Sequence, residues 1–223
     1  MLARNVILMT AALAAVVFSA ERFDHQVRNK FFAGFAGDGA ALADGMKDCE
    51  KVLAADPKHA EARVWYGSGQ MTQAAQLMGT DRAKGIEMYM AGLKNMDEAV
   101  ALAPDQVAVR VPRAAVMQAV SHFVPPDQKK ALLGRVVADY EHVLELQASS
   151  WASVGTHPKG ELLFGLADAY SRTGENEKAA AMFERVQKEL PGSVYAKRAA
   201  KWLETRMPLA VAETRCVGCH TEK

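Results

Sequence analysis

Residues 160–191 read GELLFGLADAYSRTGENEKAAAMFERVQKELP, and this stretch sets the architecture expected for the whole chain. Apolar residues recur at i, i+3, i+4 and i+7, which is one face of a helix; they are Leu163, Leu166, Ala167 and Tyr170. Gly174 then adopts positive φ without strain and so ends that helix. A second apolar series runs until Pro191, which cannot continue a helix; it is Ala179, Phe183, Val186 and Leu190. The stretch therefore predicts two helices joined by a tight turn.

The second of these helices has weaker copies earlier in the chain. Each copy repeats a small or apolar residue, a larger one, an apolar one and a closing proline. The copies are Gly45, Cys49, Val52 and Pro57; Gly92, Met96, Ala99 and Pro104; and Val136, Tyr140 and Val143, with Ala148 at the proline position. From Gly45 through Gly92 and Val136 to Ala179, the four series begin 47, 44 and 43 residues apart. Repeats of this kind stack helical hairpins over a continuous core.

The series from Leu163 to Pro191 resembles a tetratricopeptide repeat, and the resemblance covers roughly residues 38–206. It implies stacked antiparallel helical hairpins in which the small Ala179 lets two helices approach and Phe183 fills the groove between them. It also implies binding of other proteins, usually as peptide segments. The family's usual repeat is about 34 residues, shorter than the spacing here. A HEAT-like array, whose repeats have this longer spacing, is the alternative architecture.

The expected fold is all-α, with no strand pattern above noise. An N-terminal helical segment over residues 21–37 precedes the repeat domain of residues 38–206, whose last helix, over residues 194–206, caps the stack. The longer repeat requires insertions, and we expect one at residues 147–160 and a break at Pro125 and Pro126. Pro112 is expected in the first turn of a helix, where a missing N–H is tolerated.

Two further features of the repeat region have alternative interpretations. Cys49 occupies a core position and is interpreted as a small buried apolar residue; a reactive thiol is the alternative. Phe31, Phe32 and Phe35 form an aromatic cluster. The cluster fits either a packed N-terminal helix or a docking patch beside a membrane.

Residues 1–20 are predicted to be an export segment. Arg4 precedes an apolar run over residues 6–20, and charge returns at Glu21. This order is typical of a cleaved secretory signal, with Val17 and Ser19 before the cut. A retained membrane anchor is the alternative; fifteen helical residues rise about 22 Å, against a hydrocarbon core of roughly 30 Å. Both place the remainder outside the cytoplasm, in the periplasm, with membrane association through residues 2–20 in the second case.

The chemistry is concentrated in the C-terminal tail, residues 207–223, which contains Cys216-Val217-Gly218-Cys219-His220. C-x-x-C-H is the attachment signature of c-type haem. Cys216 and Cys219 can reach the two vinyl groups of one porphyrin, and His220 then lies under the iron as its proximal ligand. One covalent haem c is predicted. The alternatives are a disulfide, half of a zinc site and a thioredoxin-like redox pair.

The second axial ligand of the iron must come from upstream, because only three residues follow His220. The candidates are Met207, His157 and His25, and a five-coordinate iron or a ligand from another subunit is also open. His59, His122 and His142 fall in helical segments, where a surface role is expected. The late position of the motif is similar to that of the cytochrome c′ group, although the repeat pattern is not.

Composition narrows the class of function. The net charge is +1 and no basic cluster is present, so no nucleic-acid partner is expected. No catalytic triad, carboxylate pair or phosphate loop has a suitable spacing, so we expect no enzyme. The expected function is electron transfer to a redox protein or within a membrane electron-transfer complex. The alternatives are a periplasmic scaffold whose C-x-x-C is a disulfide, and a haem sensor with an open iron site.

Overall fold

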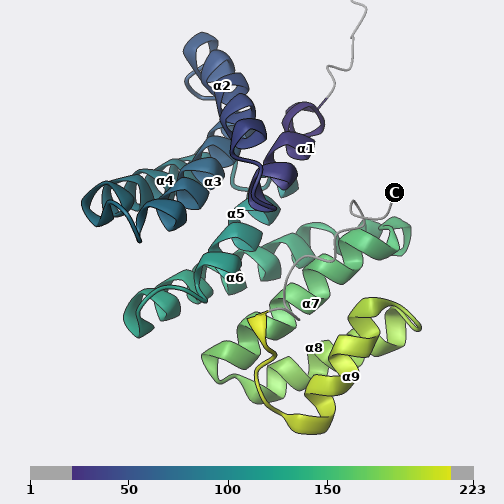
Figure 1. Cartoon of the computed structure of the whole chain (residues 1–223). Coiled ribbons are helices and arrows are strands. Elements are labelled where there is room, and N and C mark those ends of the chain that lie inside the picture. The colour runs from purple at the N-terminus through teal and green to yellow at the C-terminus, as the bar shows by residue number, and fades with distance from the viewer. Residues whose placement is uncertain (1–21, 212–223) are drawn as a thin grey trace, which may run out of the picture.

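The computed structural model describes residues 22–211, and every regular element in that range is helical (Figure 1). The elements are α1 (Phe23–Phe35), α2 (Gly39–Ala55), α3 (Ala60–Leu77), α4 (Arg82–Leu102), α5 (Val107–Val120), α6 (Pro126–Leu146), the 3-10 helix η1 (Ala148–Ser153), α7 (Thr156–Thr173), α8 (Asn176–Glu189) and α9 (Val194–Thr205). The expectation of an all-α fold is confirmed.

The α-helices form antiparallel hairpins that stack side by side. The pairs are α1 with α2, α3 with α4, α5 with α6, and α7 with α8, and α9 packs on α8 to close the stack. The first helices of successive hairpins also contact one another, from α1 through to α9. One apolar core runs through these contacts. The arrangement is compatible with a tetratricopeptide-like repeat fold.

The small residues of the repeated series lie where two helices approach most closely. A Cβ atom added at Gly92 would stand 2.9 Å from the carbonyl oxygen of Gly67, so the backbones of α4 and α3 almost touch. In the last hairpin Ala179 is fully buried, and the ring of Phe183 packs between Phe164 and Trp202. Side chains of this size at these positions allow the core to close without voids.

The turn between α7 and α8 has the predicted geometry. Gly174 has a φ of 84°, the left-handed region that glycine adopts without a steric penalty. The N–H of Glu175 donates to the carbonyl of Tyr170 at 2.9 Å, and the N–H of Gly174 donates to that of Ser171 at 3.3 Å. These two bonds are a Schellman motif, which satisfies carbonyls that the helix end leaves without a partner.

Two expectations about helix boundaries were wrong. Pro112 is not in a first turn, because α5 begins at Val107 and places it inside the helix. The side chain of Gln106 does not cap this helix, whereas its carbonyl accepts the N–H groups of Val109 and Arg110. The insertion expected over residues 147–160 is also shorter, since α7 starts at Thr156 and holds Pro158 in its first turn, where no helical N–H is needed. Long helices absorb the remaining extra residues of the repeat, with 21 residues each in α4 and α6.

The N-terminal aromatic cluster is divided between core and surface. Phe31 is fully buried, with its ring centroid 5.1 Å from that of Trp65. Phe32 and Phe35 remain 36% and 39% exposed.

Cys49 lies in the core as expected, and burial raises the pKa of its thiol to about 12, so it is present as an unreactive thiol. Within residues 22–211, no helix combines the length and the apolar character needed to cross a bilayer.

Candidate functional site

The predicted haem-attachment residues Cys216, Cys219 and His220 lie outside the described residues, as does the apolar segment of residues 1–20. The structure does define where the C-terminal tail leaves the stack. The last described residue is Val211, six residues after the end of α9. Leu209 is buried in the core, so the chain is held against the stack up to this point.

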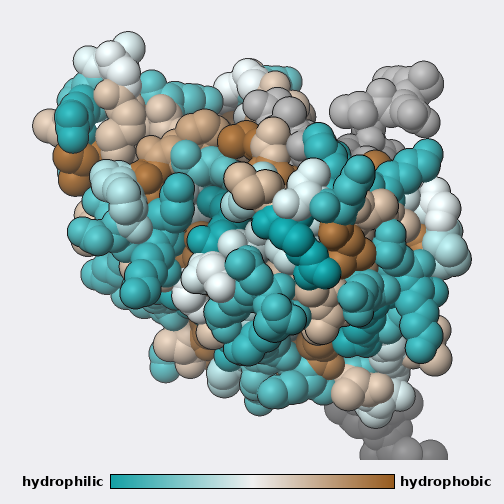
Figure 2. All heavy atoms as spheres, turned by 90° about the horizontal axis from the view of Figure 1, so that it is seen from below, coloured by the Kyte–Doolittle hydropathy of each residue, from teal (hydrophilic) through white to brown (hydrophobic). Residues whose placement is uncertain are grey.

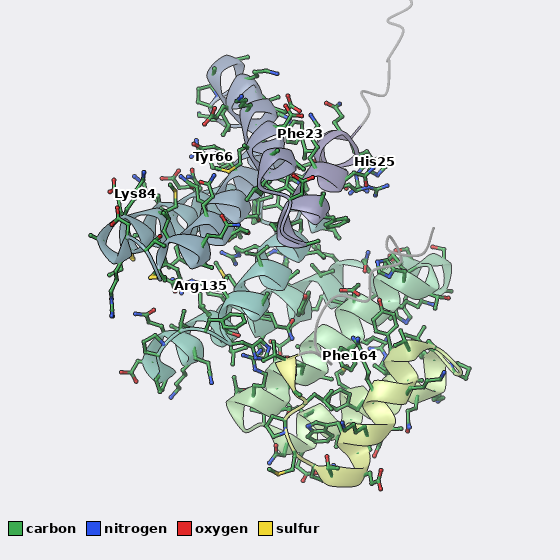
Figure 3. The ribbon with its side chains drawn as sticks, viewed as in Figure 1. Phe23, His25, Tyr66, Lys84, Arg135 and Phe164 are labelled. Atoms are coloured by element: carbon green, nitrogen blue, oxygen red, sulfur yellow. The ribbon has the colours of Figure 1, made fainter. Side chains whose placement is uncertain are left out.

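The alternating direction of the helices gives the stack two edges. One edge contains the α1–α2, α3–α4, α5–α6 and α7–α8 turns together with the C-terminal end of α9, and we call it the exit edge. The α3–α4 turn of this edge lies on the left in Figure 1, and Lys84, at the start of α4, marks it in Figure 3. The opposite edge contains the start of α1 and the turns that join one hairpin to the next. The chain therefore leaves α9 at the exit edge.

A row of hydrogen bonds links the C-terminal ends of α9, α7 and α5 at the exit edge. The indole N–H of Trp202 in α9 donates to Oγ of Ser171 in α7 at 2.7 Å. The neighbouring Arg172 donates to Oγ of Ser121, just after α5, at 2.5 Å. Gln118 in α5 also donates to Asp168 in α7 at 2.7 Å. The ends of these three helices are thus fixed relative to one another.

Asp168 is the buried acid in this row. Burial raises the pKa of its carboxyl, while Arg172 and Gln118 act in the opposite direction by stabilising the charged form. Its Oδ2 atom accepts hydrogen bonds from Gln118 and Arg172, and its buried Oδ1 atom has no hydrogen-bond partner among the described residues. This acid joins α7 to the end of α5 and is not exposed to a ligand.

The three upstream candidates for the second iron ligand lie in different places. Met207 is at the exit edge, directly after α9, and its side chain is 65% exposed. His157 lies in the first turn of α7, at the opposite edge, with Nδ1 2.9 Å from the hydroxyl of Tyr195. His25 lies at the start of α1, also at the opposite edge, near Asp24 (Figure 3). The structure does not bring these three residues together.

Two of the remaining histidines have hydrogen-bonding roles at the opposite edge. His59 caps the start of α3, where its Nδ1 accepts the N–H of Ala62 at 3.1 Å. His142, near the end of α6, lies 2.7 Å from a carboxylate oxygen of Asp105. Both contacts agree with the surface role expected for these residues.

His122 is the remaining histidine of residues 22–211. It follows α5 directly, at the exit edge, and is half-buried. Burial first, and then the positive charges of Arg172 and Lys129, lower the pKa of its imidazole from 6.5 to about 4. Phe123, the next residue, is 74% exposed. His122 therefore follows the first helix of its hairpin, as Arg206 follows α9.

A shallow pocket of about 440 Å³ lies between α8 and Arg206, and the charged side chains of Glu177, Glu184 and Arg206 line it. Within the described part of the chain, no three His, Cys, Asp or Glu side chains gather as a metal site.

More of the exposed large apolar side chains lie at or near the exit edge than at the opposite edge. Those near the exit edge are Phe32, Phe35, Met78, Ile86, Phe123 and Met207; those at the opposite edge are Leu102, Leu146 and Val194; and Met90 lies further along α4. Figure 2 shows a largely hydrophilic surface on which apolar patches lie towards the left and also nearer the centre. No family model, curated protein or solved structure matches the chain.

Proposed function

We propose that the chain is an exported mono-haem c-type cytochrome that transfers electrons to a redox protein or within a membrane electron-transfer complex. The observation that carries the proposal is the sequence Cys216-Val217-Gly218-Cys219-His220. The apolar export segment at the other end of the chain supports it, because bacteria attach this haem outside the cytoplasm. Two independent features of the sequence therefore agree on one compartment and one chemistry.

In this proposal Cys216 and Cys219 hold the haem through thioether bonds, and His220 is the proximal ligand. The bound haem supplies a one-electron iron couple. The helical stack then serves to position the tail. Trp202, through Ser171, fastens α9 to α7, and Leu209 fastens the following segment to the core. The attachment motif begins five residues beyond the last described residue.

The helical stack is, in this proposal, a tetratricopeptide-like superhelix that presents the tail to a partner. The four hairpins, the small residues at their close approaches and the closing helix α9 support this fold. The exposed apolar side chains at the exit edge support docking of a partner there, since weak electron-transfer complexes use small interfaces. The start of α1 lies at the opposite edge, so an anchor in residues 2–20 would hold the exit edge away from the bilayer.

The test is covalent haem on the exported chain. The full-length gene is expressed in a host that matures c-type cytochromes, and the product is run on a denaturing gel stained for haem peroxidase activity. The proposal predicts a stained band for the wild type and for the matched control Cys49→Ala, and no band for the double variant Cys216→Ala, Cys219→Ala. A colourless but folded wild type would overturn the proposal and leave the scaffold with a disulfide.

A further inference from the structure

We infer that the face of α4 that carries Ile86 and Met90, with Tyr89 and Arg135 beside it, binds an acidic amphipathic helix of a partner protein. The inference goes beyond the proposed function, because it concerns the helical stack and holds whether or not the tail carries a haem. Three properties of this face carry it: the direction in which the face points, its exposure and the charges around it.

The contacts of Asp97 show which way this face of α4 points. Its carboxylate pairs with Arg113 of α5 at 2.9 Å and with Arg135 of α6 at 3.4 Å, so it faces the third hairpin. In Figure 3 Arg135 lies between α4 and α6. Met90 and Ile86 precede Asp97 by seven and eleven residues, a spacing that places all three on one side of a helix. The two apolar residues therefore point towards the same side as Asp97.

The apolar part of this face is left uncovered. Leu93, nearer to Asp97, is partly buried against the core, whereas Met90 and Ile86, nearer to the exit edge, are 59% and 47% exposed. A surface helix normally turns its apolar face towards a neighbouring element. The start of α4 therefore keeps two apolar side chains that no other part of residues 22–211 covers.

The charged group beside this face has one positive charge more than it has negative charges. Asp139 of α6 is fully buried and pairs with Arg110 and Arg113. Asp97 pairs with Arg113 at 2.9 Å, and its contact with Arg135 is longer, at 3.4 Å. Three guanidinium groups thus share two carboxylates, and Arg135 is 39% exposed. A carboxylate from a partner would complete this group, since guanidinium and carboxylate form strong charge-assisted hydrogen bonds.

Tyr89 and Arg82 extend the complementarity to an acidic partner. Tyr89 is only 9% exposed, and its hydroxyl has no hydrogen-bond partner among the described residues. The charge of Arg135 acts on this hydroxyl, opposing the rise in pKa that burial causes, so both groups are within reach of one ligand. Arg82, four residues before Ile86 and so on the same face, is exposed and pairs with no acid of residues 22–211.

The order of these side chains identifies the kind of partner. Along the face, Arg82 comes first, then Ile86 and Met90, and then Arg135 with its neighbouring hydroxyl. An amphipathic helix whose apolar residues are flanked by acids matches this order, because such helices dock through anchors at i and i+4. A second copy of the chain matches it poorly. A two-fold axis through the face would set arginine against arginine.

The experiment measures binding of a fluorescent synthetic helix to the purified full-length protein by fluorescence anisotropy. The peptide carries two leucines four residues apart, with a glutamate one turn outside each. The inference predicts binding to the wild type and a loss of affinity of about tenfold or more for Met90→Asp and for Arg135→Gln. Arg135→Glu should lose this peptide and bind a version in which lysines replace the glutamates.

The matched control is Lys84→Gln, which removes a cation from the other side of α4 and should change the affinity by less than about twofold. Circular dichroism checks that each variant is folded. Absence of binding to the wild type, unchanged binding by folded Met90→Asp and Arg135→Gln, or equal weakening by Lys84→Gln would overturn the inference. So would a wild-type dimer in sedimentation velocity that Met90→Asp dissociates, since it would assign the face to a second copy. None of these variants alters the haem-attachment motif, so haem staining reports separately on the proposed function.

Discussion

The indole N–H of Trp202 donates a hydrogen bond to the hydroxyl of Ser171 at 2.7 Å, and both residues are buried. This contact joins the closing helix α9 to the last turns of α7. It fixes the end of the stack from which the C-terminal tail leaves. The position of the tail therefore depends on a buried polar pair as well as on apolar packing.

Replacing Ser171 by Ala should destabilise the protein. The variant leaves the indole N–H of Trp202 buried without an acceptor, which costs about 1–3 kcal/mol. Urea unfolding followed by circular dichroism measures the change. Ser150→Ala is the control, because Ser150 is exposed and its change should stay within about 0.5 kcal/mol. Equal stabilities for the two variants would show that the contact is not formed.

Gly160 should not tolerate a methyl group. A Cβ atom there would stand 2.2 Å from the ring of Tyr195, whose hydroxyl is held by Glu161 and His157. Gly160→Ala should destabilise by about 1–3 kcal/mol, because the pinned ring cannot move aside cheaply. Gly134→Ala, at an open position in α6, should stabilise by up to about 1 kcal/mol. The two variants should thus shift the thermal midpoint in opposite directions, and shifts of the same sign would contradict this packing.

The periodicity of residues 160–191 predicted α7, α8 and the turn at Gly174, because apolar spacing and a left-handed glycine are local signals. The copies around Gly45, Gly92 and Val136 predicted the second helix of each earlier hairpin. The start of α5 was missed, since Pro112 suggested a first turn and the structure places it inside the helix. There the tertiary pairing of Arg113 with α6 outweighs the local signal.

Replacing Asp139 should lower the free energy of unfolding more than replacing any other charged residue of the stack. It is fully buried and accepts hydrogen bonds from Arg110 and Arg113, each at 2.7 Å. Asp139→Asn removes a buried charge that faces two guanidinium groups, of which Arg113 keeps only the ion pair with Asp97, and should cost about 3–5 kcal/mol. Asp97→Asn removes a carboxylate that is 41% exposed and should cost less than about 1 kcal/mol. Chemical denaturation of both variants compares the two losses of stability. A larger loss for Asp97→Asn than for Asp139→Asn would contradict the prediction.

The attachment motif could be predicted from the sequence, because its five residues are contiguous. The positions of the upstream histidines could not, because they depend on which helix ends share an edge. His122 and the end of α9 are about 80 residues apart in sequence, and only the alternation of hairpins places both at the exit edge. His157 and His25 were proposed as iron ligands because one lies in a loop and the other near the N-terminus. The sequence does not show which edge of the stack each of them occupies.

The stability of the haem-free double variant Cys216→Ala, Cys219→Ala should depend on the protonation of His122. The pKa of this imidazole is about 4 in the folded state and near 6.5 when unfolded. The unfolded chain therefore binds more protons between these values, and stability falls as the pH drops from about 6.5 towards 4. Adding His122→Gln should remove this part of the pH dependence, measured by urea unfolding at pH 7 and pH 5. An equal loss of stability between pH 7 and pH 5 with and without His122→Gln would contradict the role of this imidazole.

Thiol labelling should report one buried cysteine in the haem-bearing protein. Cys49 is fully buried with its pKa raised to about 12, so iodoacetamide at pH 8 should not modify it in the native state. After unfolding under reducing conditions, one thiol should react, because Cys216 and Cys219 are held in thioethers. Rapid labelling of the native protein would show that Cys49 is accessible.

The most direct test is the intact mass of the mature chain, purified under reducing denaturing conditions after export. We predict the mass of the polypeptide plus one haem, with the added mass localised to the peptide that contains Cys216 and Cys219. A chain that carries no added mass, with both cysteines recovered as thiols, would contradict the assignment of an electron-transfer cytochrome.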